Sequence, residues 1–360
     1  MLQGVKLLKF NRQVYGCCSF LVNPGYFCPP MNEQPSLYFA PFQGITTKAF
    51  REVYARHFFG TDKLYTPYFA NIAVDYPLPP LKLKALREQF ENGIPVIPQI
   101  LSKSAPEILW FAQCCAGLGF DELNWNLGCP YPQVARKKRG SGLLPHPEMV
   151  GEILDQLMNR MPLRFSVKCR LGYGDAGEIQ NLIPVFNRYP LSEIIIHPRI
   201  GKQLYSGSPD LRAFGEAFTA LQHPVVYNGD VTLPANLQYL KSEFPGINRF
   251  MIGRGLLADP FLAARIKGIA LNGEETGILK KFTDDLYYTY RNDKKESHTV
   301  LNAMKEYWKY LILSFDDPQS VFRKIRKTAS YNEYEEAVKR VFDEHALAEI
   351  NPSGIFPADG

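Results

Sequence analysis

Short β-rich runs alternate with helical stretches between residues 37 and 253, and this alternation most constrains the fold. Branched and aromatic residues are concentrated in eight runs, at 37–40, 62–66, 95–101, 122–126, 164–171, 193–197, 224–228 and 249–253. Helical periodicity occurs between them, at 105–116, 148–158, 209–220 and 233–242. Eight strands that alternate with helices favour a closed α/β fold, the TIM (β/α)8 barrel, over an open sheet. A dinucleotide-binding sheet is disfavoured, because no G-x-G-x-x-G motif follows the first run.

The strand signals stop after about residue 267. Beyond that point the periodicity predicts helices at 280–291, 298–313, 318–327 and 333–347. The tripeptide Asp-Asp-Pro at 316–318 is typical of a turn that begins a helix. We therefore predict three segments, which are an N-terminal extension over 1–35, a barrel over 36–268 and a small all-helical domain over 275–350.

The composition is that of an ordinary globular protein. Hydrophobic residues make up 46% and charged residues 21%, and the formal net charge of +5 permits a polyanionic partner without requiring one. The seven cysteines include no C-x-x-C pair, which favours free thiols in a reducing cytoplasm and gives no sign of a metal site. No apolar run reaches membrane-spanning length. We expect a cytoplasmic protein without a membrane partner, and a monomer.

The first thirty residues allow two interpretations. Lys6, Lys9 and Arg12 precede the apolar run 14–22, which weakly resembles a signal peptide. This run is short and leads into Asn-Pro-Gly without a small-residue cleavage pattern. We therefore expect a poorly ordered extension rather than an exported leader, with Met31 as an alternative natural start.

Polar residues and glycines follow nearly every predicted strand. They occupy the strand ends at 40–44, 98–99, 124–130, 168–170, 197, 228–230 and 253–255. Barrel enzymes carry their catalytic groups at the carboxyl ends of the strands. Because the strand bodies are apolar, this distribution indicates a functional site at one end of the barrel.

Glycines after the last two strands favour an anion site. Gly229 and Gly253 can bring backbone N–H groups close to an anion, and Arg254 adds positive charge. Barrels often bind phosphate between these two strand ends. Either glycine alone is explained by a tight turn, but the two together with Arg254 favour a phosphate group.

Lys168 and Arg170 lie two residues apart on one strand and therefore face the same side. A buried cation requires an anionic or polar partner, and the apolar character of 165–167 favours burial over surface salt bridges. His197 ends a β-rich run, where ligand contact and a structural hydrogen bond are equally open. Gln99 can bond the amide edge of a ligand, although its position alone does not establish this.

Cys129 lies in a constrained loop at a strand end, between a glycine and a proline. Cys114 and Cys115 fall within a predicted helix, and Cys169 faces the opposite side of its strand from Lys168. Cys129 is therefore expected to have the exposure of a reactive thiol. Its role, as nucleophile or as acid, stays open on chemistry alone.

These residues, in this order, resemble the dihydrouridine synthase family. The sequence Asn-Leu-Gly-Cys-Pro at 126–130, followed by Val134 and Gly140-Ser141, is similar to the signature around that family's catalytic cysteine. The family's flavin-binding strand ends resemble Gln99, Lys168, His197, 228–230 and 253–254. The resemblance covers 37–267, and the helical remainder resembles the family's tRNA-recognition domain, only loosely at 304–311. Trp125 stands where the family usually has a small aliphatic residue, and the chain before Leu37 has no counterpart.

The resemblance implies a flavin-dependent reduction of a uridine in transfer RNA. NADPH, or NADH, would reduce bound FMN, hydride would pass to carbon 6 of the uracil, and Cys129 would protonate carbon 5. The residues implied to lie along the flavin ring and its polar edge are Pro41, Phe42, Gln43, Gln99 and Lys168, and His197 is implied to approach the ring or the phosphate. Those implied at its phosphate are Asn228, Gly229, Asp230, Gly253 and Arg254, and those at the uracil are Asn126 and Arg170.

A uracil must leave the stacked tRNA to enter a barrel, so recognition would depend on shape and phosphate contacts. One dense basic run near Cys129 consists of Arg136, Lys137, Lys138 and Arg139. Another in the helical tail consists of Arg323, Lys324, Arg326 and Lys327. Basic runs are usually solvated surface, but two runs that flank the site favour a tRNA-binding surface.

Two alternatives remain at this point. A flavin barrel that acts on free pyrimidines, akin to dihydroorotate dehydrogenase, shares the lysine and Gly-Arg features, although the basic run and the helical tail disfavour it. A barrel that binds RNA without chemistry would lack the cysteine, the lysine or the phosphate loop, and none of these is missing. The sequence does not indicate which uridine is reduced, or whether NADPH or NADH is the reductant.

Overall fold

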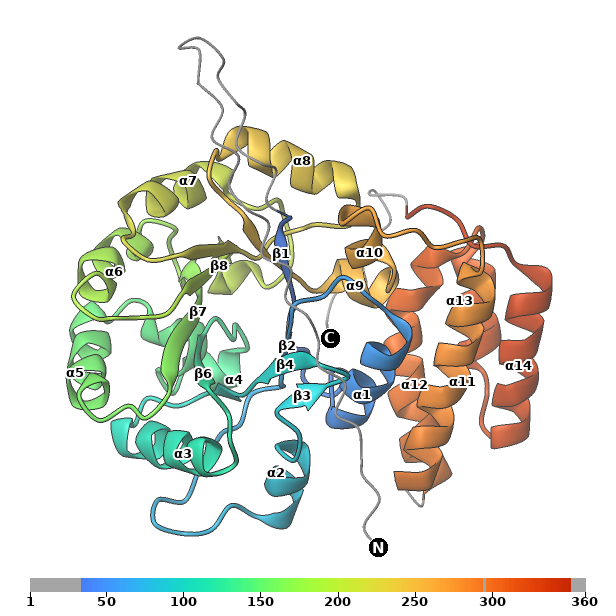
Figure 1. The fold of residues 1–360 in the computed structure, drawn as a ribbon, viewed down its shortest axis with the longest axis horizontal. Coiled ribbons are helices and arrows are strands. Elements are labelled where there is room, and N and C mark those ends of the chain that lie inside the picture. The colour runs from blue at the N-terminus through green and yellow to red at the C-terminus, as the bar shows by residue number, and fades with distance from the viewer. Residues whose placement is uncertain (1–33, 294–295, 351–360) are drawn as a thin grey trace, which may run out of the picture. The chain divides into compact units, whose positions relative to one another are not determined.

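The computed structural model describes residues 34–293 and 296–350, which form a barrel followed by helices (Figure 1). The predictions for 1–33, including the alternative start at Met31, lie outside the described residues. The strands are β1 (Ser36–Phe39), β2 (Lys63–Tyr65), β3 (Phe90–Glu91), β4 (Ile94–Ile97), β5 (Gln99–Ile100), β6 (Glu122–Leu127), β7 (Arg164–Gly172), β8 (Ile194–Ile200), β9 (Val225–Tyr227) and β10 (Arg249–Ile252). They match all eight predicted runs.

Parallel pairing closes these strands into a ring. β1 pairs with both β2 and β10, and the order then continues through β9, β8 and β7 to β6. β4 pairs with β2, and β5 pairs with β6. The predicted strand 95–101 is thus one barrel position that Pro98, which has no N–H to donate, divides in two. The predicted TIM (β/α)8 barrel is confirmed, and β3 lies outside the ring as an antiparallel partner of β4.

Helices cover the outer face of the barrel. The longer ones are α1 (Lys48–His57), α3 (Ala105–Gly117), α5 (Pro147–Met158), α6 (Glu178–Phe186), α7 (Leu211–Ala220) and α8 (Pro234–Glu243). Short helices lie in the connections, namely α2 (Pro80–Ala85), α4 (Pro132–Ala135), α9 (Arg254–Ala258) and α10 (Leu262–Ile266). The four predicted helices correspond to α3, α5, α7 and α8, with ends that agree within two residues. The prediction does not include α1, or α6, which has Pro184 within it.

The inner faces of the strands divide into an apolar layer and a polar layer. The apolar layer consists of Tyr38, Ala40, Tyr65, Ile97, Ile195, Val226 and Met251. Near the amino ends of the strands, the Glu193 carboxylate accepts hydrogen bonds from Tyr65 at 2.9 Å and from Lys63 at 3.0 Å. The Lys63 ammonium also donates to Glu122 at 3.1 Å. Because these buried charged groups are paired with one another, this end of the barrel needs no ligand to balance them.

The outer faces of the strands pack against the helices in the main hydrophobic core. Trp125, the residue that departs from the family pattern, points into this core and is fully buried. Its indole N–H donates to the Ser102 carbonyl at 2.8 Å, and its ring stacks on Phe165. The large side chain is therefore accommodated outside the barrel, on the face opposite to the neighbouring Asn126.

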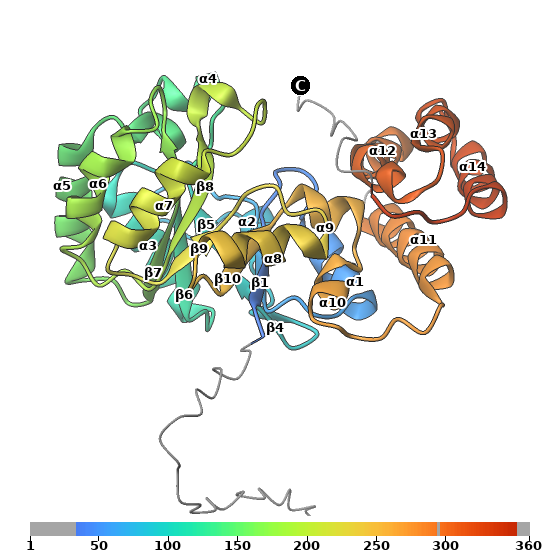
Figure 2. The ribbon, with the colours of Figure 1, turned by 90° about the horizontal axis from the view of Figure 1, so that it is seen from above.

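The chain after the barrel forms the helices α11 (Glu275–Asp293), α12 (Ser297–Leu311), α13 (Pro318–Arg326) and α14 (Tyr331–Glu344). All four predicted helices are present, although α11 begins five residues before the predicted 280. Both ribbon views place these helices beside α1, α9 and α10 (Figures 1 and 2). Phe282 of α11 and Tyr307 of α12 pack edge-on against each other and against Phe50 of α1. The boundaries 36–268 and 275–350 stay a prediction about independent domains.

In the parts of the chain that the structure describes, no helix has the length and apolarity needed to cross a membrane.

The aromatic packing predicts that Phe282→Ala destabilises the protein. The side chain is fully buried, and its ring lies 4.8 Å from Phe58 and 5.7 Å from Tyr307, measured between ring centroids. Truncation of a buried phenylalanine leaves a cavity and lowers the free energy of unfolding by about 3–5 kcal/mol. Tyr288→Ala, on the exposed side of the same helix, is the matched control with a much smaller expected loss. Equal urea midpoints for the two variants would contradict this prediction.

Candidate active site

A cavity of about 900 Å³ opens where the carboxyl ends of the strands meet the C-terminal helices. Nine of the residues predicted from strand ends line it, namely Pro41, Phe42, Gln43, Gln99, Asn126, Cys129, Lys168, Arg170 and His197. They come from five different strands or the loops that follow them. The distribution of polar residues along the sequence therefore identified one real cavity.

The loop that carries Cys129 is fixed by hydrogen bonds to its backbone. The side-chain oxygen of Asn126 accepts from the N–H groups of Gly128 at 3.0 Å and Cys129 at 2.8 Å. The Arg170 guanidinium donates to the Gly128 carbonyl at 3.0 Å. The Ser141 hydroxyl donates to the Cys129 carbonyl at 2.9 Å. These bonds hold both sides of the thiol in one position.

Gly140 is required for the same loop. Its φ is +56°, and a Cβ at this position would lie 2.7 Å from the carbonyl oxygen of Cys129. Any side chain would therefore displace the cysteine backbone. The Gly140-Ser141 pair in the motif thus has a structural reason, since the glycine permits the close approach and the serine bonds the carbonyl.

The thiol of Cys129 is buried, with only 6% of the residue exposed, so the expected exposure is wrong. It borders the cavity rather than bulk solvent, on a loop whose backbone Ser141 and Arg170 hold in place. Burial raises the pKa of the thiol above its ordinary value, while the Tyr131 N–H and the Tyr68 hydroxyl act in the opposite direction. The group therefore stays protonated at neutral pH, as a proton donor must.

Gln99 and Asn126 belong to a buried hydrogen-bond chain. The Gln99 side chain donates to Asn124 at 2.8 Å and accepts from Asn126 at 2.7 Å. Asn124 donates to Ser166 at 2.9 Å, and Ser166 donates to Glu122 at 2.9 Å. Each amide thus uses part of its bonding capacity within the protein, which leaves less of it for a ligand than the sequence suggested.

Lys168 faces the cavity, on the same side of β7 as Arg170, as predicted, while Cys169 is buried in the outer core. Among the described residues, no hydrogen bond or ion pair engages the Lys168 ammonium. Burial, with a contribution from the neighbouring Arg170 guanidinium, lowers the pKa of Lys168 to about 8. An incompletely compensated cation at this depth favours an anionic or strongly accepting ligand.

Arg170 itself is almost fully buried and acts mainly on the backbone. Besides the Gly128 carbonyl, its guanidinium donates to the carbonyls of Ile200 at 3.0 Å and Leu204 at 2.6 Å. It also lies over the ring of Tyr205, 5.3 Å from the centroid. The side chain predicted to orient a uracil therefore joins the cysteine loop to the segment after β8.

His197 accepts a hydrogen bond at Nε2 from the Arg199 guanidinium, at 3.1 Å. A guanidinium can only donate, so this ring nitrogen carries no proton. Burial, followed by the charges of Arg170 and Lys168, holds the pKa of His197 well below its ordinary value. His197 is therefore neutral, with its proton on Nδ1, and contacts the cavity in that form.

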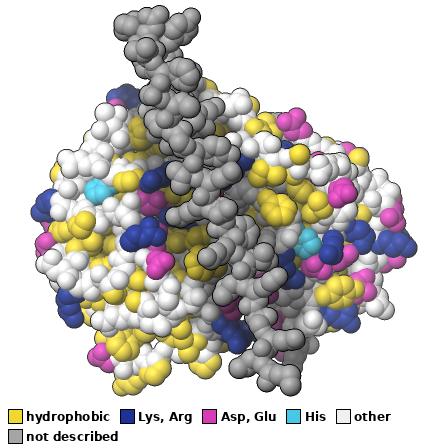
Figure 3. Space-filling model, viewed as in Figure 1, with side chains coloured by type: hydrophobic (Ala, Val, Ile, Leu, Met, Phe, Trp, Pro, Cys, Tyr) yellow, Lys and Arg dark blue, Asp and Glu magenta, His cyan; other side chains and the backbone are white. Residues whose placement is uncertain are grey.

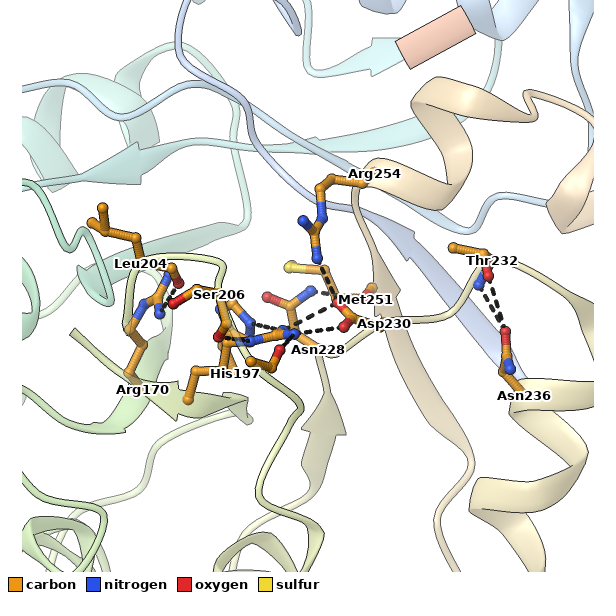
Figure 4. Close-up of polar contacts among 12 residues, drawn as sticks. Arg170, His197, Leu204, Ser206, Asn228, Asp230, Thr232, Asn236, Met251 and Arg254 are labelled. Carbon is orange, nitrogen blue, oxygen red and sulfur yellow. Dashed lines mark hydrogen bonds and ion pairs between the residues drawn. The ribbon is translucent and has the colours of Figure 1, made fainter. Parts of the chain in front are cut away.

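The strand ends after β9 and β10 form an ion network rather than part of the cavity wall (Figure 4). Asp230 accepts from Arg199 at 2.6 Å and from Arg254 at 2.7 Å. Asn228 donates to the Met251 carbonyl at 2.7 Å. Arg199 was missed by the sequence analysis, although it follows His197 by two residues on the same strand. Two arginines against one carboxylate leave net positive charge at this edge of the site.

Packing alone explains the two glycines in this region. A Cβ at Gly229 would lie 2.2 Å from the Tyr227 hydroxyl, and a Cβ at Gly253 would lie 2.9 Å from the Phe42 ring. Neither glycine has a positive φ in the described chain. These close approaches account for both glycines without a ligand, and a phosphate contact stays a prediction.

The basic run after the cysteine loop does not line the cavity. Arg136, Lys137 and Lys138 are exposed on the loop around α4. Arg139 is half-buried and donates to the Asn71 side chain at 2.9 Å. The run therefore presents three solvated cations next to the loop that carries Cys129.

Several cavity residues were not predicted. Tyr68 follows β2, Tyr131 follows Cys129 by two residues, and Tyr205 follows β8. The C-terminal helices add Glu306, Lys309, Tyr310, Ile312, Leu313, Pro318, Gln319 and Phe322. The Tyr310 ring packs edge-on against Phe42, with the centroids 5.9 Å apart. No local signal distinguishes these residues from ordinary loop and helix positions.

The fold and the site define a (β/α)8-barrel enzyme with its polar residues at the carboxyl ends of the strands. The sequence profile of the dihydrouridine synthase (Dus) family matches residues 38–351. The chain therefore belongs to the dihydrouridine synthase family, which consists of flavin enzymes that modify tRNA. The family predicted from the Cys129 motif is confirmed.

Curated proteins of this family are similar to the chain. A probable tRNA-dihydrouridine synthase of Rhodobacter capsulatus is 28% identical over 236 residues, which are 64% of this chain and 71% of that protein. A tRNA-dihydrouridine(16) synthase of Neisseria meningitidis is 25% identical over 264 residues, which are 71% and 78% of the two chains.

Among solved structures, histamine dehydrogenase from Rhizobium sp. 4-9 superposes with a TM-score of 0.51 at 12% identity. The match covers 70% of this chain and 48% of that chain, so this chain spans about half the length of that protein. At this identity the similarity concerns the barrel fold alone.

The cavity residues fit a flavin. Pro41 and Phe42 provide an apolar wall, and the Lys168 ammonium lacks a partner among the described residues. A flavin ring offers both an apolar face and a polar edge that becomes anionic on reduction. The apolar wall of the cavity therefore suits the face of a flavin ring, and the Lys168 ammonium suits its polar edge.

The hydrogen bonds of Asn126 predict that Asn126→Ala loosens the cysteine loop. The change leaves the buried N–H groups of Gly128 and Cys129 without their acceptor. We expect amide hydrogen exchange in the peptide that contains Cys129 to become about tenfold faster. Asn181→Ala, on the exposed side of α6, is the control and should leave this exchange unchanged. Unaltered exchange in Asn126→Ala would show that other contacts fix the loop.

Proposed function

We propose that this chain reduces a specific uridine of tRNA to 5,6-dihydrouridine, with bound FMN, NADPH or NADH as reductant, and Cys129 as general acid. The observation that carries the proposal is a buried, protonated thiol at the same barrel mouth as a lysine with no partner among the described residues. Membership of the dihydrouridine synthase family supports this assignment of the cavity.

Bound FMN, once reduced by NADPH or NADH, would supply a hydride to carbon 6 of the uracil. The Cys129 S–H bond then breaks, its proton forms the new C–H bond at carbon 5, and the electron pair stays on sulfur as a thiolate. The thiolate takes a proton from water before the next turnover. Asn126 and Arg170 hold the loop so that the sulfur keeps its position during this step.

The proposed flavin contacts follow the cavity wall. Pro41, Phe42 and Gln43 would lie along the ring, and Lys168 would balance negative charge at its polar edge. The residues proposed on the phosphate side are His197, Asn228, Gly229, Gly253 and Arg254, together with Asp230, which would hold Arg254 rather than the phosphate itself. Of these, His197 lines the cavity and the others lie at strand ends outside its wall. Arg199 joins this set, because it bonds both His197 and Asp230.

The substrate would be a flipped base of a folded tRNA. A thiol with 6% of its residue exposed cannot reach a uracil that stays stacked in a helix. The exposed Arg136, Lys137 and Lys138 would contact phosphates beside the cavity. We propose 275–350 as the tRNA-recognition region, because its helices supply one wall of the cavity. The contribution of these helices to the cavity also favours the hypothesis of a macromolecular substrate over that of a free pyrimidine.

The second basic run is less uniform in charge than its sequence suggests. Lys324 of α13 pairs with Glu344 of α14 at 2.6 Å. Figure 3 shows both signs of charge mixed over the C-terminal helices on the face it presents. In α13, Arg323 and Arg326 thus remain the more suitable cations for phosphate contacts. The free cysteines of the described chain are consistent with the cytoplasmic location that we propose.

The proposed acid predicts that Cys129→Ala abolishes product formation while flavin binding persists. Cells that lack the protein should lose dihydrouridine from tRNA, and wild type but not Cys129→Ala should restore it. Cys114→Ala, on the outer helix α3, is the matched control and should restore it fully. Full restoration by Cys129→Ala, measured by mapping dihydrouridine in tRNA, would remove the acid role.

The pKa of Lys168 predicts a pH dependence of FMN binding. Because burial lowers this pKa to about 8, the ammonium is mostly charged at pH 7 and mostly neutral at pH 9. If FMN requires the charged form, its affinity falls by about tenfold between these values, as flavin fluorescence can measure. Lys168→Arg stays charged throughout and should show no such fall. Identical pH profiles for the two proteins would contradict this role for Lys168.

A further inference from the structure

Tyr68 is a polar cavity residue that the proposed mechanism does not yet use. It lies in the loop after β2, separated from the strand by Thr66 and Pro67, and it lines the same cavity as Cys129. The side chain is half-buried, whereas Cys129 is buried. The two side chains are near enough for each to shift the pKa of the other. The phenol is thus a more exposed neighbour of the buried thiol in the cavity wall.

The direction of a hydrogen bond between Tyr68 and Cys129 follows from the chemistry of the two groups. Burial, and then the nearby sulfur, raise the pKa of Tyr68 to about 12, so the phenol keeps its proton at neutral pH. A neutral phenol can donate to sulfur, and a thiolate accepts more strongly than a thiol because it is charged. Such a bond is therefore stronger after Cys129 has lost its proton than before.

We propose that Tyr68 is a positioning residue that donates a hydrogen bond to the Cys129 sulfur and stabilises the thiolate formed when the proton passes to carbon 5. This inference rests on the proposed role of Cys129 as the acid. The S–H bond breaks, the C–H bond forms, and the pair left on sulfur is held by the Tyr68 O–H, which keeps its own proton. An interaction that is stronger in the product of proton transfer than in the reactant favours the step.

Other groups around the sulfur contribute independently of Tyr68. The Tyr131 backbone N–H and the charges of Arg170 and Lys168 on β7 each lower the pKa of the thiol. All three remain when the Tyr68 hydroxyl is removed. Tyr68→Phe therefore removes only the contribution of the Tyr68 hydroxyl to the stability of the thiolate. The phenylalanine keeps an aromatic ring in the cavity wall.

The test is the pH dependence of Cys129 alkylation in the full-length, FMN-loaded protein. Iodoacetamide reacts with the thiolate, and mass spectrometry of the peptide that contains Cys129 separates this thiol from the other cysteines. We expect the midpoint of the profile to rise by about one pH unit in Tyr68→Phe, a tenfold change in the proton equilibrium. Tyr76→Phe, at an exposed tyrosine outside the cavity lining, is the matched control.

A second measurement links the bond to turnover. In single-turnover reduction of unmodified tRNA, Tyr68→Phe should be slower than wild type, while reduction of its flavin by NADPH keeps the wild-type rate. An alkylation midpoint equal to that of wild type would overturn the role of Tyr68. Failure of the proposed acid role of Cys129 would give a different result, because Cys129→Ala would then still form dihydrouridine. A thermal midpoint of Tyr68→Phe close to wild type separates the effect from misfolding.

Discussion

A buried chain of hydrogen bonds connects the structural end of the barrel with its reactive end. It begins at the Glu122 carboxylate, passes through Ser166 and Asn124 to Gln99, and ends at Asn126, which holds the cysteine loop. The members alternate among β5, β6 and β7, so each bond also depends on the register of neighbouring strands. In an interior of low polarity, a missing member leaves its neighbours unsatisfied at high cost. The position of the thiol is thus a consequence of how the sheet is assembled.

The polar chain also explains which sequence predictions succeeded. Residues at strand ends can be assigned to a cavity from sequence, because parallel strands bring their carboxyl ends to the same side. This reasoning placed Cys129, Lys168 and His197 correctly in one cavity. The same reasoning could not determine how many hydrogen bonds each polar side chain already makes within the protein. Gln99 and Arg170 looked like free ligand groups in sequence, yet the structure commits much of each to neighbouring amides or carbonyls.

Some of the residues that were missed lie on segments without a regular period. Tyr68 and Tyr205 follow strands by several residues, at distances where the alternation of side chains no longer indicates direction. Tyr310 lies on a helix whose amphipathic pattern predicts burial but not the partner it is buried against. Its contact with Phe42 joins residues that are far apart in sequence, and a single chain contains no signal for such pairing. The exposure expected for Cys129 was wrong for the same reason, since neither Arg170 nor Ser141 is adjacent to it in sequence.

Arg170 connects two segments at the edge of the cavity. Its guanidinium bonds the carbonyl of Gly128 on one side and the carbonyls of Ile200 and Leu204 on the other. Leu204 has a φ of +52°, a backbone conformation that costs energy for a leucine and persists only where the surroundings enforce it. The two rims of the cavity are therefore tied to one rigid planar group. Whatever displaces the segment after β8, on which Tyr205 lies, pulls on the loop that holds the thiol.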